Sequence, residues 1–304
     1  MTLPVPESSS SGVLLVSFCN VAAHPLPSCL VRFDLGTRAV EWVDVGLGGE
    51  LLASGVGLCH DDALLYHLSI RNSDFATLLT ILDKVSLTVR SVTELTEISD
   101  GHSLVRRGLD LVVVSTGTDE ILSYRVNGTG VSAPRLVWSP TGARDDTHHL
   151  NSVAVVGGRL LCTGFGPKTN DSWTSASQGY VFDIDTGTTV REGLHQPHTI
   201  CEHQGRIMLC NSRLGSIDDL DGPIGFLSGY SRGLAFAPDG TIYAGTSLAR
   251  RATPALSGAT EFDNPNTPGV LHGRCAVVVM APNGPRIEIG MSAYGAEIYD
   301  LLLV

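Results

Sequence analysis

Short apolar segments that each open on a polar residue recur along most of the chain. Each is followed by a tight turn and a second apolar segment, as in the stretch from His198 to Ser212. Short apolar runs bounded by turn residues are typical of buried β-strands. We call the polar residues that open the four clearest repeats the lead residues, and they are His102, Asn151, His198 and Arg232.

The repeat is roughly 45 residues long, which is the length of one four-stranded propeller blade. Six inner strand pairs begin near Gly55, His102, Asn151, His198, Arg232 and Glu297. The last repeat has only its inner strand, whereas the chain begins with strands that have no lead residue. The N-terminal strands therefore should complete the last blade and close the ring, which leaves no open sheet edge. The sequence predicts one all-β domain, a six-bladed β-propeller over residues 12–304, after a loose tail over residues 1–11.

Two polar segments, 166–178 and 248–273, interrupt the period and are longer than hairpin loops. Each follows the second strand of an inner pair, so each should overhang the axial mouth toward which the lead residues point. Such loops often carry substrate contacts. The sequence leaves their roles open.

Composition excludes several other classes. Only 17% of residues are charged and 34 are glycines, which suits short buried strands and tight turns. A net charge of −11 argues against nonspecific binding to nucleic acid or an anionic membrane. The seven cysteines form no CxxC pair, and no signal peptide or membrane span is recognisable, so we expect a cytoplasmic protein.

The lead residues should meet around one channel because the innermost strands of a propeller begin at its axis. His149 lies two residues before Asn151, so we expect it to join them on the same strand face. Imidazole and carboxylate or amide oxygens together can bind a divalent transition metal with open coordination positions. The metal ligands predicted in this way are His102, His149, Asn151, His198 and Glu297.

The remaining candidates concern substrate. Arg232 cannot ligate a metal because its guanidinium stays charged, but it can hold a carboxylate or phosphate. Basic and aromatic side chains near the same face would assist it. The predicted substrate-binding residues are Arg232, Lys168, Trp173, Arg213 and Arg250, and the predicted catalytic residues are His149, His198 and Arg232. The alternative for each of these residues is that it only lines a water-filled channel and has no role in binding or catalysis.

The chain resembles an uncharacterised bacterial family of six-bladed propellers over roughly residues 100–304. The motifs that carry this resemblance are His149-Leu-Asn151, Pro197-His198, Arg232-Gly-Leu-Ala-Phe236 and Glu297-Ile-Tyr-Asp300. The blade that starts at Arg232 is also similar, more distantly, to those of the gluconolactonase and NHL-repeat superfamily. That resemblance implies a divalent ion on the axis, for which Glu297 and Asn151 are two possible ligands. Histidines at positions where oxygens would be expected favour Zn, Fe or Mn over Ca.

Three hypotheses follow. The first is a metal-dependent hydrolase, lyase or isomerase that acts on a small anionic molecule at the axial mouth. The second is a non-catalytic propeller that binds a peptide, a glycan or a protein partner. The third is a metal-free enzyme that uses His149 or His198 as general acid and base. The sequence names neither the substrate nor the oligomeric state.

Overall fold

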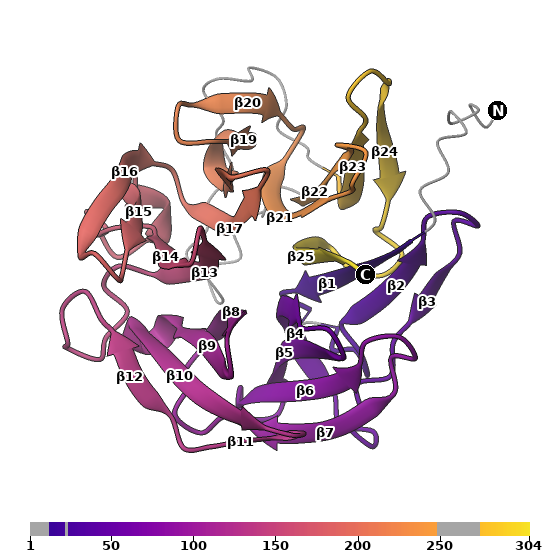
Figure 1. Ribbon diagram of the computed structural model, residues 1–304, viewed down its shortest axis with the longest axis horizontal. Coiled ribbons are helices and arrows are strands. Elements are labelled where there is room, and N and C mark those ends of the chain that lie inside the picture. Colours follow the sequence, from indigo (N-terminus) through magenta and orange to yellow (C-terminus); the bar gives the residue numbers. More distant parts are fainter. Residues whose placement is uncertain (1–11, 22–23, 248–273) are drawn as a thin grey trace.

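Six sheets stand around a common axis in the computed structural model, which describes residues 12–21, 24–247 and 274–304. Figure 1 shows the ring viewed along this axis, with one innermost strand of each sheet facing the centre. The prediction of an all-β six-bladed propeller is therefore confirmed. The predicted tail at 1–11 and the loop at 248–273 lie outside the described residues.

The innermost strand of each blade carries the start of a repeat. The residue ranges of these strands are β4 (Leu52–His60), β8 (Gly101–Arg107), β13 (Leu150–Val156), β17 (Pro197–His203), β21 (Tyr230–Phe236) and β25 (Glu297–Leu303). We number the blades by sequence, so that blade 1 contains β25 and blades 2 to 6 begin with β4, β8, β13, β17 and β21.

The outer strands follow each inner strand in order through antiparallel pairing. In blades 1 to 3 they are β1 (Val13–Cys19), β2 (Leu30–Asp34), β3 (Val40–Trp42), β5 (Leu64–Arg71), β6 (Thr77–Asp83), β7 (Val89–Glu94), β9 (Asp110–Ser115), β10 (Glu120–Asn127), β11 (Gly130–Val131) and β12 (Arg135–Trp138). In blades 4 to 6 they are β14 (Arg159–Gly164), β15 (Gly179–Asp183), β16 (Thr188–Leu194), β18 (Arg206–Asn211), β19 (Ser216–Asp218), β20 (Pro223–Phe226), β22 (Ile242–Ser247), β23 (Ala276–Met280) and β24 (Arg286–Gly290). Three short 3-10 helices complete the described elements: η1 (Thr116–Thr118), η2 (Trp173–Ser175) and η3 (Ser212–Leu214).

Blade 1 closes the ring by joining the two ends of the described chain. Its sheet has the order β25-β1-β2-β3, and β25 pairs with β1 from Leu14 opposite Leu303 to Cys19 opposite Glu297. The N-terminal strands thus complete the last blade, as the missing lead residue predicted. This pairing covers the two strand edges that an open ring would expose.

Buried apolar side chains fill the interfaces between blades. In the described residues they form six clusters. Five of them each join one pair of neighbouring blades, and the sixth joins blades 2 and 3 and also includes Cys19 and Tyr299 of blade 1. For example, Tyr66 of blade 2 and Leu111 of blade 3 belong to one cluster, whereas Phe18 of blade 1 and Tyr243 of blade 6 belong to another. Because the apolar core lies between the blades, the axis is left to the starts of the inner strands.

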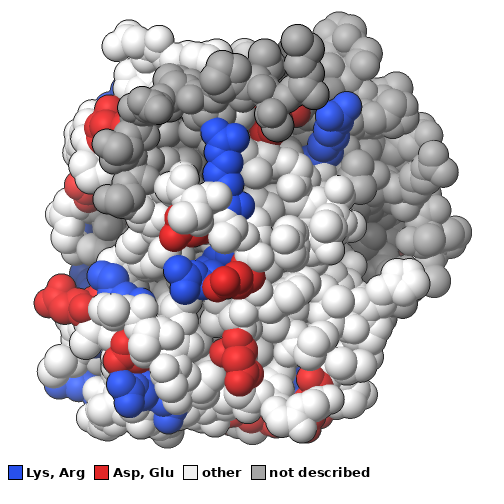
Figure 2. Space-filling view, turned by 90° about the vertical axis from the view of Figure 1, so that its right-hand side faces the viewer, with Lys and Arg blue, Asp and Glu red and all other residues white. Residues whose placement is uncertain are grey.

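The charged side chains on the outside of the molecule are mixed in sign (Figure 2). On the side of the molecule drawn in Figure 2, acidic and basic groups lie interspersed among many uncharged ones. The described residues contain no helix that is long and apolar enough to span a membrane.

Gly233 sets how closely blade 6 approaches blade 1. Its φ is +73°, and a Cβ atom there would lie 2.8 Å from the backbone nitrogen of Leu301 in β25. A side chain at this position would therefore strain the backbone and push β21 away from the closing strand.

We expect Gly233→Ala to lower the free energy of unfolding by about 1–3 kcal/mol, measured by urea denaturation. Gly225→Ala is the matched control, because a Cβ atom there meets nothing within 4 Å. The control should change stability by less than about 0.5 kcal/mol. Equal effects of the two substitutions would contradict the close approach at the closing blade.

Candidate active site

The inner strands are irregular where they begin, at the mouth of the axis. The pairing register shifts between Gly101 and Leu104 in β8, and between Leu150 and Ser152 in β13. The other four inner strands or their partners carry comparable shifts. Bulges of this kind bend a strand and redirect its side chains. They turn the first residues of each inner strand toward the axis.

A second local feature repeats in blades 3, 4 and 5. The residue two positions before the lead residue has a left-handed backbone, with φ of 51° at Asp100, 51° at His149 and 55° at Gln196. This conformation is uncommon outside glycine and persists where the surrounding structure fixes it. It turns the chain sharply as it enters each inner strand.

The turn places a backbone carbonyl against the lead imidazole. Nδ1 of His198 lies 3.0 Å from the carbonyl oxygen of Gln196 and 2.8 Å from Oγ of Ser212. Nδ1 of His102 lies 2.9 Å from the carbonyl oxygen of Asp100. A carbonyl can only accept, so Nδ1 must carry the proton in both rings. Nε2 of each neutral ring is then left as a lone-pair acceptor.

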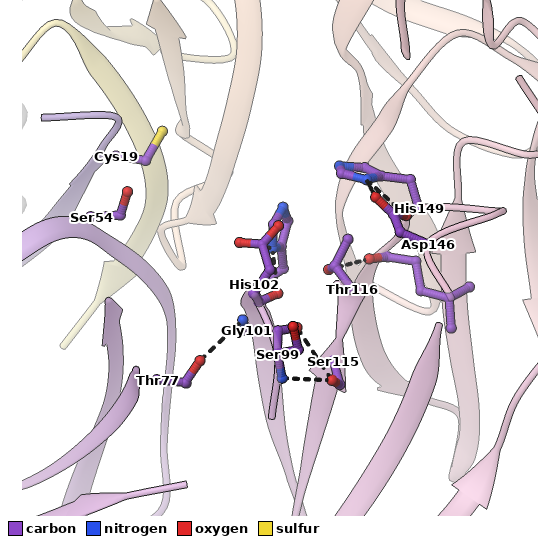
Figure 3. Close-up of polar contacts among 12 residues, drawn as sticks. Cys19, Ser54, Thr77, Ser99, Gly101, His102, Ser115, Thr116, Asp146 and His149 are labelled. Atoms are coloured by element: carbon purple, nitrogen blue, oxygen red, sulfur yellow. Dashed lines mark hydrogen bonds and ion pairs between the residues drawn. The ribbon is translucent and has the colours of Figure 1, made fainter. Parts of the chain in front are cut away.

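His149 joins the same group, but not from the strand position that the sequence suggested. It lies just before β13, in the left-handed conformation, and its ring centroid is 5.3 Å from that of His102. Nδ1 lies 3.2 Å from a carboxylate oxygen of Asp146, which again assigns the proton to Nδ1. Figure 3 shows His102 and His149 beside one another. Asp146 lies against His149, and Cys19 lies on the side of His102 that faces away from His149 (Figure 3).

Two aromatic rings pack against the three imidazoles. Tyr299 lies edge-on to both His102 and His198, at centroid distances of 5.7 Å and 6.3 Å. Phe165 bridges His149 and His198 at 4.5 Å and 5.2 Å. Sequence reasoning missed both aromatic residues. The signal was available for Tyr299, because it lies two residues after Glu297 on the same inner strand.

Arg232 and Glu297 form a buried ion pair on the closing side of the mouth. Nη1 of Arg232 lies 2.9 Å from Oε2 of Glu297 and 3.1 Å from Sγ of Cys19. The guanidinium also lies 4.7 Å from the ring of Tyr230 and 5.5 Å from the ring of Tyr299. Burial disfavours the charge of Arg232, but Cys19, Tyr230 and Glu297 outweigh it and raise the pKa of the guanidinium. Arg232, which was predicted to hold an anion, and Glu297, which was predicted to bind a metal, are thus paired with each other.

Burial keeps two of the histidines neutral. It lowers the pKa of His102 from its ordinary value of 6.5, with a further lowering from His149. It lowers the pKa of His198 well below that value, and the nearby charge of Arg232 acts in the same direction. Both rings are therefore lone-pair donors at neutral pH.

Asn151 lies apart from the three rings. Its side chain is 1% exposed, lines a cavity along the axis, and has no hydrogen-bond partner among the described residues. The structure thus brings His102, His149 and His198 together and places Asn151 in the wall of a cavity that these three histidines do not line.

The loop 166–178 covers the mouth, as its position after β14 predicted. Trp173 packs on His149 at a centroid distance of 4.6 Å, and Nζ of Lys168 lies 4.6 Å from the Trp173 ring. The carbonyl of Trp173 accepts a hydrogen bond from Gln196. Arg213 lies in η3, where its backbone N–H donates to the carbonyl of His195. Arg250 lies outside the described residues.

The imidazole nitrogens are suitable ligands for a transition metal, but the side chains are not placed to bind one ion together. Histidine ligands normally donate the second ring N–H to a carbonyl or carboxylate, as all three imidazoles do here. However, no three His, Cys, Asp or Glu side chains among the described residues form a group placed to hold a metal ion. Glu297 is in addition paired with Arg232.

The ring of blades and its polar mouth define the class of protein as a six-bladed β-propeller with an axial site. The chain belongs to the family described as "Domain of unknown function (DUF4915)", whose model matches residues 83–304. No curated protein matches the chain.

Solved structures share the fold at low sequence identity. A "putative" 6-phosphogluconolactonase from Bacteroides fragilis has a TM-score of 0.57 and 14% identity, with 98% of this chain and 99% of that chain covered. The calcium-binding protein regucalcin from Agrobacterium tumefaciens has a TM-score of 0.53 and 13% identity, with coverages of 81% and 76%. A chain of the nidogen/laminin complex reaches 0.61 at 10% identity, with coverages of 96% and 97%. These likenesses concern the fold alone, because one fold can carry unrelated functions.

We expect the Arg232 and Glu297 substitutions to be strongly coupled. Glu297→Leu leaves a buried guanidinium without its carboxylate and should lower the free energy of unfolding by about 3 kcal/mol, and Arg232→Met should have a similar effect. The double variant should lose less than the sum of the two, because it leaves neither charge alone. Urea denaturation of the four proteins measures this, and additive losses would contradict a buried pair.

Proposed function

We propose that the axial mouth is the active site of an enzyme that acts on a small anionic molecule by hydrolysis, elimination or isomerisation, with a neutral histidine as general base. The observation that supports this most is the common state of His102, His149 and His198. Each ring gives its Nδ1 proton to an oxygen acceptor, which leaves Nε2 lone pairs at one mouth. Histidines that only bind water at the rim of a channel would not all need to donate the Nδ1 proton to a protein oxygen.

His149 is the general base in this proposal. The carboxylate of Asp146 holds its Nδ1 proton and stabilises the imidazolium that forms when Nε2 takes a proton from substrate or water. Asp146 is then a positioning residue, because it acts through His149. The edge of His102 beside the same ring limits where the reacting atom can lie.

The basic residues at the mouth supply the preference for an anion. Lys168 carries its ammonium over Trp173, and Trp173 packs on His149, so a positive charge lies near the proposed base. Arg232 adds a guanidinium whose Nε has no hydrogen-bond partner among the described residues. Because Glu297 compensates the charge of Arg232, Lys168 is the residue expected to decide affinity for the anionic group.

A metal-dependent enzyme is the second candidate, and the anchoring of all three Nδ1 atoms favours it. His102, His149 and His198 would hold a divalent ion such as Zn, Fe or Mn through Nε2 after a shift of the side chains. A bound ion would act as a Lewis acid there. Glu297 is not expected among the ligands, because its carboxylate is held by Arg232 and Asn20.

The proposal that His149 is a general base is tested with small lactones and esters that bear a carboxylate or phosphate. A pH indicator follows the acid that their hydrolysis releases. We expect His149→Gln to lower kcat by roughly 100-fold or more, the usual effect of losing a general base. His24→Gln, at an exposed position, is the matched control and should be unchanged. Lys168→Ala should raise KM for the anionic compounds and leave their uncharged counterparts unaffected.

Equal rates of wild type and His149→Gln would refute this role. Elemental analysis of protein purified without a metal-affinity tag separates the two candidates. Near-stoichiometric metal that disappears in His198→Ala establishes the metal-dependent form, whereas full turnover after chelation establishes the metal-free form. A panel without turnover, together with binding to a peptide or glycan array, would instead favour a non-catalytic propeller.

A further inference from the structure

A cavity of about 340 Å³ lies along the propeller axis, bounded by all six inner strands. Its lining includes Leu58, Val105, Val153, Ile200 and Leu234, so that most of its wall is apolar. Asn151 and Tyr299 also line it. The ring of Tyr299 contacts His102 and His198, so this residue separates the cavity from the histidines. A volume of this size is within the range of small-molecule sites.

The Ser and Thr hydroxyls of the lining accept hydrogen bonds from the backbone of neighbouring blades. Oγ of Ser103 accepts from the backbone N–H of Val153, and Oγ1 of Thr199 accepts from that of Gly233. Ser152 accepts from the N–H of Ile200 and also bonds Thr163. These bonds tie the bulged strands of neighbouring blades together, so the hydroxyls are structural.

Asn151 and Tyr299 differ from these hydroxyls. Both amide atoms of Asn151 and the hydroxyl of Tyr299 have no hydrogen-bond partner among the described residues, although the two residues are 1% and 7% exposed. An unpaired buried polar group costs roughly 1–3 kcal/mol, so a fold gains nothing by keeping three such atoms at one cavity. A ligand that pairs with them would recover that free energy.

The charges around the cavity restrict the ligand. No Lys or Arg lines it, whereas Asp300 and Glu202 do. Asp300 accepts the backbone N–H groups of Leu58 and Leu301, so its carboxyl group is already committed. Burial raises the pKa of Asp300 to about 7. An anion in this cavity would therefore meet one partly ionised carboxyl group, the carboxylate of Glu202 and no Lys or Arg.

We propose that the axial cavity is a second binding site, for an uncharged small molecule with an apolar body and one amide or similar group that both donates and accepts hydrogen bonds. The amide of Asn151 pairs with that group in both directions, and the hydroxyl of Tyr299 supplies a further bond. The apolar side chains of the inner strands enclose the body. This site does not depend on the proposed reaction, because the lining excludes the three histidines and Lys168.

Cyclohexanecarboxamide is a suitable probe, with cyclohexanecarboxylate and cyclohexylmethylammonium as charged compounds of similar shape. Binding is measured on the full chain by calorimetry and by the shift of the thermal midpoint. We expect the amide to bind at least tenfold more tightly than either ion. Asn151→Leu should weaken amide binding at least tenfold, and Tyr299→Phe should weaken it several-fold. His149→Gln should bind the amide as wild type does, which separates this proposal from the proposed reaction.

Two variants distinguish a ligand site from a structural role. Asn151→Leu is close in shape and removes the unpaired amide, so the ligand-free variant should unfold at the same temperature as wild type or higher. Thr116→Val breaks a bond between Oγ1 of Thr116 in blade 3 and the carbonyl of Leu150 in blade 4, and Thr116 does not line the cavity. This variant should therefore unfold at a lower temperature but bind the amide normally. A lower midpoint for Asn151→Leu would assign the amide to the fold. Equal binding of all three compounds, or no binding at millimolar concentration, would show a cavity that holds only water.

Discussion

The arrangement of the mouth depends on a hydrogen bond between each lead imidazole and the backbone just before its strand. In blades 3 and 5 the residue two positions earlier adopts a left-handed conformation, and its carbonyl accepts the Nδ1 proton of His102 or His198. The bond fixes the tautomer and the direction of the ring together. Blade 4 uses the same backbone turn differently, because there the left-handed residue is itself the histidine, and Asp146 replaces the carbonyl.

Closure of the ring supplies the other half of the mouth. Cys19 and Glu297 come from opposite ends of the described chain and face each other in the β1 and β25 pairing. Together they surround the guanidinium of Arg232 from blade 6. The positive charge is therefore buried only where the closing blade supplies a carboxylate, so that the electrostatics of the site and the stability of the ring are linked. The side of the mouth formed by blades 3 to 5 instead presents three imidazoles packed among aromatic rings.

Much of the fold could be predicted from the sequence, because its signals are periodic. Polar lead residues followed by apolar strands gave the blade count, and the unmatched N-terminal strands gave the closure of the ring. The convergence of His102 and His198 follows from that geometry. The route of His149 into the site could not be predicted from strand alternation, since it depends on a left-handed residue before β13. The pairing of Arg232 with Glu297 was also missed, because residues considered singly by chemical type do not reveal which of them neutralise one another.

The tautomer and charge of His102 and His198 test most directly whether backbone carbonyls hold these rings. Long-range proton–nitrogen NMR of histidine-labelled protein, with His102→Gln and His198→Gln for assignment, reports the tautomer and charge of each ring. We expect the Nδ1–H tautomer for both rings at pH 7. We also expect both rings to stay neutral as the pH falls through 6.5, since burial lowers the pKa of each. A proton on Nε2, or imidazolium at pH 6.5, would contradict the carbonyl-anchored mouth.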